Sequence, residues 1–108
     1  MNRSIIIPAK NEAESLVTLL PEIKLQQPNA EIVVVNDGST DDTQKICEAE
    51  GVVVVSHPYS KGNGAAIKSG ARAATGDVLV FRYLVYKTTE KTVGTSSTVN
   101  IVLEEGGT

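Results

Sequence analysis

The stretch EIVVVNDGSTDDT (31–43) joins an apolar run to an acidic turn. Its first half is rich in β-branched residues, and such a run predicts a buried strand over residues 31–36. The run stops at Asn36 and Asp37, where small polar residues take over. Because the turn is acidic and directly follows a buried strand, it either holds a ligand or only connects the strand to a helix. Both interpretations predict the same local structure.

A helix is predicted directly after this turn. Ser39 or Thr40 can cap it, and Asp41 and Asp42 would then occupy its first turn, where the helix dipole favours carboxylates. Gly51 is expected to end this helix, since glycine is common just beyond the last helical residue.

The same alternation of apolar runs and helical patterns continues on both sides. A helix is predicted from Glu12 to just before Pro28, and an Ala-rich helix within residues 61–77. Further strands are predicted at residues 4–7, which Pro8 is expected to end, at 52–55 and at 78–81. Strands that alternate with helices in this way predict an α/β fold, a Rossmann-like three-layer structure with a parallel sheet. Ligands of such sheets bind beyond the carboxyl ends of the strands.

The composition indicates a single ordinary domain. The chain has 108 residues, of which 41% are hydrophobic and 21% charged, with a net charge of −3. Neither nucleic acid nor an anionic membrane is expected as a partner of an acidic protein. Cys47 is the only cysteine, so no internal disulfide is expected. The apolar residues near the N-terminus are too few for a signal peptide or a transmembrane segment, and we expect a cytoplasmic location.

The pattern changes from about residue 82. The segment 82–108 is rich in threonine and lacks the alternation of the first 81 residues. Two β segments are predicted there, at about 79–89 and 98–104, with a turn near 94–97. We therefore expect a division into residues 1–81 and a β-rich tail, 82–108, that adds a hairpin or an extended strand pair to the sheet.

Several motif matches fail on inspection. The glycine-rich segment at 62–70 lacks the glycine before Lys68 that a Walker A loop requires, and Ile67 stands where a dinucleotide fingerprint needs its third glycine. A calcium loop starting at Asp37 would need glycine at position 42, which is aspartate. His57 and Cys47 have no metal-ligand spacing around them and are interpreted as a loop histidine and a small helix residue.

Two of the predicted loops at the carboxyl ends carry groups suited to a nucleotide. Asp37 can accept hydrogen bonds from ring N–H groups or ribose hydroxyls. Lys61 and the backbone of residues 62–64 precede a helix, where phosphate oxygens are favoured. The alternative is that the same residues only form turns and helix entries.

Three segments together resemble a known family: SIIIPAKNEAESL, EIVVVNDGSTDDT and KGNGAAIKSGARAATGDVLVF. They are similar, in order and spacing, to the N-terminal half of the family 2 glycosyltransferases of the GT-A fold, over about residues 3–81. The dolichyl-phosphate mannosyltransferase-like branch is the nearest. The resemblance implies that a nucleotide or nucleotide-sugar (a UDP- or GDP-sugar) is bound by Pro8, Ala9, Asn11, Glu12, Asp37, Gly38, Lys61, Gly62, Asn63 and Gly64.

The sequence departs from the family after the fourth strand. There the family has two aspartates that hold Mg²⁺ or Mn²⁺, and the matching positions are Tyr83 and Val85. We therefore expect no metal cofactor. The half that supplies the acceptor site and the catalytic base has no counterpart in residues 82–108.

These departures predict a truncated or chimeric protein that binds a nucleotide and has no catalytic residues. Two alternatives stay open. The chain could be an active metal-independent glycosyltransferase in which Arg82 neutralises the diphosphate. It could instead be a non-catalytic scaffold. We also expect a homo-oligomer that assembles through edge strands.

Overall fold

The computed structural model describes residues 2–86 and 96–104, and side chains as far as Tyr83. None of the described helices is long and apolar enough to cross a membrane. The elements, in chain order, are β1 (Arg3–Ala9), α1 (Ala13–Gln26), β2 (Glu31–Asp37), α2 (Thr43–Glu50), β3 (Val53–His57), α3 (Asn63–Ala73), β4 (Val78–Tyr86) and β5 (Ser96–Glu104).

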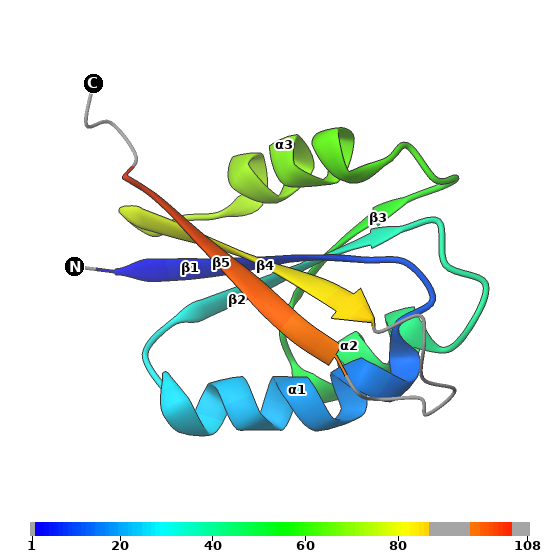
Figure 1. Ribbon diagram of the computed structural model, residues 1–108, viewed down its shortest axis with the longest axis horizontal. Helices are drawn as coiled ribbons and strands as arrows, with labels where there is room; N and C mark the ends of the chain where they lie inside the picture. The colour runs from blue at the N-terminus through cyan, green and yellow to red at the C-terminus, as the bar shows by residue number, and fades with distance from the viewer. Residues whose placement is uncertain (1, 87–95, 105–108) are drawn as a thin grey trace.

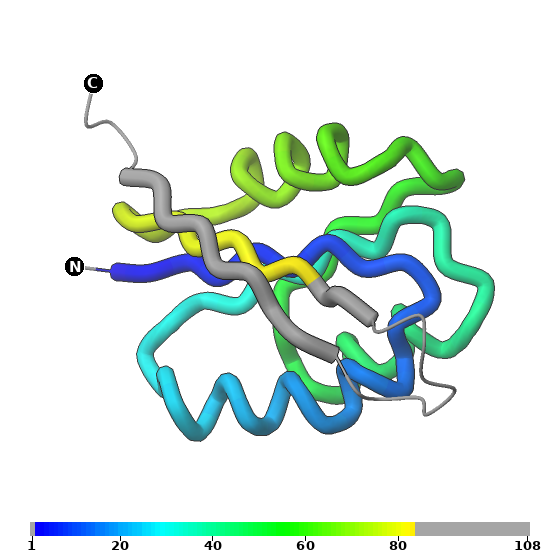
Figure 2. Tube along the Cα trace, in the orientation of Figure 1, coloured from blue at the N-terminus to red at the C-terminus, as the bar shows by residue number. Residues whose placement is uncertain are grey.

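The described strands form one sheet in the order β3-β2-β1-β4-β5. β1 pairs in parallel with β2 and β4, and β2 pairs in parallel with β3. Helices α1 and α2 cover one face of this sheet and α3 covers the other (Figure 1). In Figure 2 the blue trace of β1 runs between α3 and α1. The predicted α/β, Rossmann-like three-layer fold is therefore confirmed.

Strand β1 shows why its residues form a central strand. Ile5 and Ile7 pack on the side of α1 and α2, whereas Ile6 packs on the side of α3. All three side chains are 0% exposed. Burying such a side chain contributes about 1.5–3 kcal/mol each. A continuous apolar run is stable here because both faces of the sheet are covered.

The predicted helical face of α1 is confirmed. Leu16, Leu20 and Ile23 are fully buried, and Leu19 packs against the same core. The helix ends at Gln26, ahead of Pro28, as expected.

Several predicted boundaries are wrong, and two of them have a clear physical reason. The first concerns β1, which continues through Pro8 to Ala9. Its pairing with β4 reaches only Ile6, whereas its pairing with β2 extends to Ala9. Beyond Ile6 the strand therefore has a single neighbour, and proline is tolerated where only one side is paired.

The second wrong boundary is the start of α2. The helix begins at Thr43, so Ser39 and Thr40 do not cap it. Asp41 precedes the helix, and its carboxylate accepts the N–H of Thr43 at 3.0 Å. Gly51 does end the helix, in the left-handed conformation (φ 72°), as predicted.

The tail adds backbone to the sheet beside β4. β5 is antiparallel to β4, in a register that runs from Val78 opposite Glu104 to Tyr86 opposite Ser96. It begins at Ser96, earlier than the predicted start at residue 98. The predicted link between the two β segments falls largely on residues 87–95, which lie outside the described residues. The division at residue 81 and the expected homo-oligomer stay predictions.

Candidate functional site

Three loops gather at the carboxyl ends of β1, β2 and β3, on the right of Figure 1. They comprise residues 10–12, 38–42 and 58–62. The strand order reverses at β1, which lies between β2 and β4. Ligands of parallel sheets bind beside such a switch point. We call this edge, formed by the three loops, the rim.

The first two loops are joined through Asn11. Its Oδ1 atom accepts the N–H of Thr40 at 2.8 Å and that of Asp41 at 3.3 Å. The N–H of Asn11 donates to Ser39 Oγ at 2.9 Å. Asn11 has a positive φ of 54°, a conformation that costs most residues about 1–2 kcal/mol and that asparagine tolerates better. The predicted site residue Asn11 is therefore a link between loops.

A second set of bonds ties the start of α1 to the same loop. Asp41 Oδ2 accepts the N–H of Ala13 at 3.2 Å, and Thr43 Oγ1 accepts the N–H of Glu12 at 3.1 Å. Burial raises the pKa of Asp41, but the hydrogen bonds from Thr43 and Ala13 outweigh it and lower that pKa overall. The Asp41 carboxylate thus accepts hydrogen bonds from the first residues of both α1 and α2.

Glu12 is the group of this cluster whose pKa lies near neutral pH. Burial, and then the nearby charge of Asp41, raise the pKa of Glu12 to about 7. A carboxyl that changes charge near neutral pH is more frequent at functional sites than elsewhere. The family resemblance implied only that Glu12 is a binding residue.

The second and third loops meet at Asp37, the last residue of β2, which is 5% exposed. Its Oδ1 lies 2.7 Å from His57 Nδ1 and accepts the N–H of Lys61 at 2.8 Å. Its Oδ2 accepts the hydroxyl of Ser60 and the N–H of Gly62, each at 3.0 Å. The carboxylate therefore has a partner in each of its roughly four lone-pair positions.

These bonds decide the charge of Asp37. Burial by itself raises its pKa, but the hydrogen bonds from the Lys61 N–H, His57, the Gly62 N–H and Ser60 lower it well below the usual range. Asp37 is therefore an ionised acceptor at neutral pH.

His57 is the site residue that the sequence interpretation missed. It is not a loop residue, because it ends β3 and stands opposite Asp37 in the strand register. It is buried, and its Nε2 atom lies 2.8 Å from Ser69 Oγ on α3. The signal was available: each residue stands two positions after the last valine of an apolar run that was predicted as a strand.

Gly38 allows the third loop to approach the second. It has φ of 72°, and a Cβ atom there would lie 2.5 Å from Ser60 N and 2.7 Å from the carbonyl carbon of Tyr59. Any other residue at this position would push the 58–62 loop away from Asp37. The predicted role of Gly38 as a site residue thus has a steric basis.

Part of the backbone that was predicted to bind phosphate oxygens, before α3, makes other hydrogen bonds. The N–H groups of Lys61 and Gly62 point to Asp37, so an internal carboxylate takes the place expected for a phosphate. The Lys61 ammonium lies 5.4 Å from the centre of the exposed Tyr59 ring. Asn63 and Gly64 open α3, and Pro8 and Ala9 are buried at the end of β1.

The carboxyl end of β4 does not fit the divalent cation that the family implies. Tyr83 packs against the core on the α3 side, and position 85 is a valine. Hard cations require oxygen ligands such as carboxylates. Within residues 2–83, no three His, Cys, Asp or Glu side chains gather as a cation site would need. We therefore assign no chemistry to such an ion.

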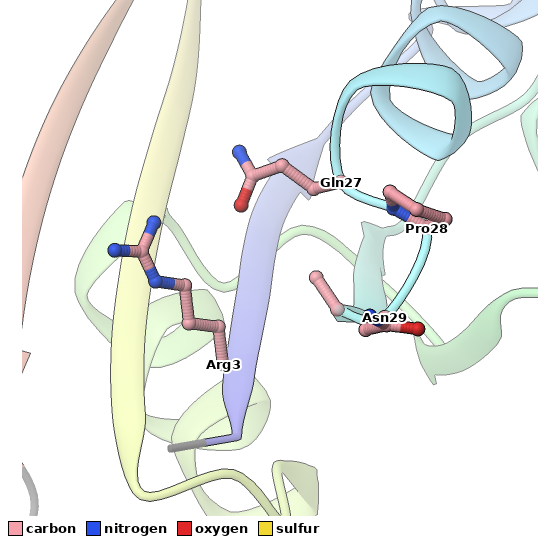
Figure 3. A pocket seen from close by; sticks show the side chains of 5 residues that line it. Arg3, Gln27, Pro28 and Asn29 are labelled. Carbon is pink, nitrogen blue, oxygen red and sulfur yellow. The ribbon is translucent and has the colours of Figure 1, made fainter.

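Two hollows lie near the amino ends of the strands, at the opposite end of the sheet from the rim. One, of about 220 Å³, is lined by Arg3 at the start of β1 and by the segment that follows α1 (Figure 3). The other, of about 350 Å³, lies beside it between that segment and the start of β3. None of the predicted site residues lines either hollow.

Comparison with known proteins gives relatives that cover the same region. An uncharacterized protein of Methanocaldococcus jannaschii is 37% identical over 70 residues, which cover 65% of this chain and 28% of that protein. The 4,4'-diaponeurosporenoate glycosyltransferase of Staphylococcus aureus is 44% identical over 52 residues, which cover 48% of this chain and 14% of that enzyme. The chain thus spans less than a third of the length of these relatives.

Solved structures show the same fold. Glucosyl-3-phosphoglycerate synthase of Mycobacterium tuberculosis, in complex with Mn²⁺, UDP and glucosyl-3-phosphoglycerate, matches with a TM-score of 0.67 and 30% identity, over 78% of this chain and 34% of that chain. A mannosyltransferase of Pyrobaculum calidifontis, in complex with GDP-Man and Mn²⁺, matches with a TM-score of 0.66 and 25% identity, over 75% and 26%.

The sequence resemblance is confirmed at the level of the family, while the resemblance to the dolichyl-phosphate mannosyltransferase-like branch stays a prediction. The sequence model of the glycosyl transferase family 2 matches residues 4–82, from the second residue of β1 to the first half of β4. The chain belongs to glycosyl transferase family 2.

Proposed function

We propose that the rim binds the nucleotide part of a nucleotide-sugar, a UDP- or GDP-sugar. The observation that carries this proposal is the buried, ionised Asp37 at the centre of the rim, tied to both β3 and the entry of α3. A charge kept in a buried position by several hydrogen bonds is typical of binding sites. The two structural relatives named above, in complex with UDP and with GDP-Man, support the same ligand class.

The predicted residues have different roles in this proposal. Asp37 faces the nucleoside, and Gly38 allows the 58–62 loop to approach Asp37 closely. Asn11 and Glu12 hold the neighbouring loop in place, with Pro8 and Ala9 as its buried base. The Lys61 side chain, together with the first N–H groups of α3 at Asn63 and Gly64, favours the diphosphate.

Nucleotide binding through these residues does not require a divalent cation. The charge of the diphosphate meets Lys61 and the amino end of α3, and no carboxylate pair stands at positions 83 and 85. We therefore expect Mn²⁺ to change the affinity for UDP or GDP by less than tenfold, which corresponds to about 1.4 kcal/mol.

Calorimetric titration of the full chain with UDP and GDP tests the proposal. Asp37→Asn should abolish measurable binding, whereas Asp77→Asn should leave it unchanged because Asp77 is exposed and lies just before β4, at the end of the sheet opposite the rim. Lys61→Ala, at an exposed side chain, should weaken UDP binding more than uridine binding. Absence of binding by the wild type, or equal binding by wild type and Asp37→Asn at matched thermal stability, would contradict the proposal.

A further inference from the structure

The carboxylate of Asp37 has no spare acceptor position for a ligand. His57 and the Lys61 N–H occupy Oδ1, and the Ser60 hydroxyl and the Gly62 N–H occupy Oδ2. A carboxylate offers about four lone-pair positions in all. A nucleoside can therefore bind to Asp37 only if one of these four donors leaves.

The four donors differ in how easily they can leave. Lys61 and Gly62 contribute main-chain N–H groups, which move only if the whole loop moves. His57 is buried and is also held by Ser69. Ser60 is an exposed residue whose donor is a hydroxyl on a rotatable side chain. Rotation about one side-chain bond removes it from Asp37 and leaves the other three bonds intact.

We propose that the Ser60 hydroxyl is a stand-in for a ligand donor, and that the ring N–H of a uracil or guanine base replaces it at Asp37 Oδ2. This inference rests on the proposed function. It assigns to Ser60 a role in nucleotide affinity that the sequence did not indicate.

The chemistry of Asp37 selects the kind of base. An ionised carboxylate only accepts hydrogen bonds, so the incoming group must be a donor. Uracil and guanine carry a hydrogen on the ring nitrogen of their pairing edge. Cytosine and adenine carry a lone pair on the matching ring nitrogen, which would face the carboxylate without a hydrogen bond. Leaving a charged acceptor without its partner is unfavourable.

The exchange has a measurable consequence. In the unliganded protein the Ser60 hydroxyl stabilises the closed carboxylate, and that bond must break before a base can bind. Ser60→Ala removes the competing bond from the free state only. The variant should therefore bind UMP and GMP about threefold to tenfold more tightly than the wild type, because a hydrogen bond of this kind contributes a modest net free energy.

The experiment compares calorimetric dissociation constants of the full chain for UMP, GMP and N3-methyluridine monophosphate. Ser60→Thr retains the hydroxyl and should bind as the wild type does. Ser56→Ala is the matched control, because the Ser56 hydroxyl bonds to Gln44 and not to Asp37. The gain of Ser60→Ala should be absent for the N3-methyl nucleotide, which lacks the ring N–H.

The outcomes separate this inference from the proposed function. If the wild type binds UMP or GMP and Ser60→Ala binds them equally or more weakly, the exchange is wrong while the proposed function stands. A gain that persists with the N3-methyl nucleotide also overturns it, because a ribose hydroxyl would then be the donor. If neither protein binds any nucleotide, the proposed function fails and the inference fails with it.

Discussion

The carboxylate of Asp37 and the imidazole of His57 form a buried pair across two adjacent parallel strands, with Oδ1 and Nδ1 2.7 Å apart. Their side chains are 8% and 6% exposed respectively. The pair is continued by Ser69 on α3, so that β2, β3 and α3 meet in one chain of hydrogen bonds. The nucleotide site proposed at the rim is built on this pair.

Replacing His57 should destabilise the protein. We expect His57→Phe to lower the free energy of unfolding by about 1–3 kcal/mol, because Asp37 would lose a donor while staying buried. Ser69→Ala, which removes only the outer bond of the chain, should cost less. Urea denaturation at pH 7 measures both. A His57→Phe protein as stable as the wild type would show that the pair contributes nothing to the fold.

Acid should destabilise the fold through the carboxylates that accept several hydrogen bonds. Asp37, Asp41 and Glu31 all have lowered pKa values, each because hydrogen bonds outweigh the effect of burial. A lowered folded-state pKa gives stability that is present above the unfolded value, near 4, and is lost as the pH falls below it. Urea midpoints measured from pH 6 to pH 3 should therefore fall, and Asp37→Asn should show a smaller fall.

Glu12 should act in the opposite direction. Its pKa is raised from 4.5 to about 7, so the folded state favours the protonated form. Its contribution to stability is present below pH 4.5 and is lost as the pH rises through about 7. Because Glu12 is partly exposed, solvent screening reduces the effect, and we expect Glu12→Gln to stabilise by about 1 kcal/mol at pH 8. At pH 4 the variant should match the wild type, and an equal gain at both pH values would rule out titration of Glu12 as its cause.

The parts of the fold that the sequence predicts are those that depend on neighbouring residues. Ile5 to Ile7 and Val33 to Val35 form strands because each run is apolar throughout, and the helical spacing of Leu16, Leu20 and Ile23 fixes the buried face of α1. Such patterns are local and need no knowledge of partners.

The start of α2 and the role of Asp37 depend on distant partners. Thr40 and Asp41 are held by Asn11, 29 and 30 residues away in sequence, and this contact keeps them out of the helix. The donors of Asp37 lie 20 to 25 residues further along the chain. A propensity or a capping rule contains no information on such contacts, so the helix was predicted to start too early and His57 was overlooked.

Gly70 should be irreplaceable for the packing of α3 on the sheet. A Cβ atom there would collide with Ile6 Cγ2 and lie 3.0 Å from Val35 Cγ2, and both of these side chains are 0% exposed. Extra volume in a tightly packed core costs about 1–3 kcal/mol, which should outweigh the better helix propensity of alanine. Gly64→Ala is the matched control, since Gly64 lies on the same helix with nothing within 4 Å of its Cβ position. Thermal and urea denaturation should show Gly70→Ala destabilised and Gly64→Ala equal to the wild type or more stable. Equal stability of the two variants would show that α3 moves outward without cost, and the close approach of α3 to β1 would then contribute nothing to the stability of the fold.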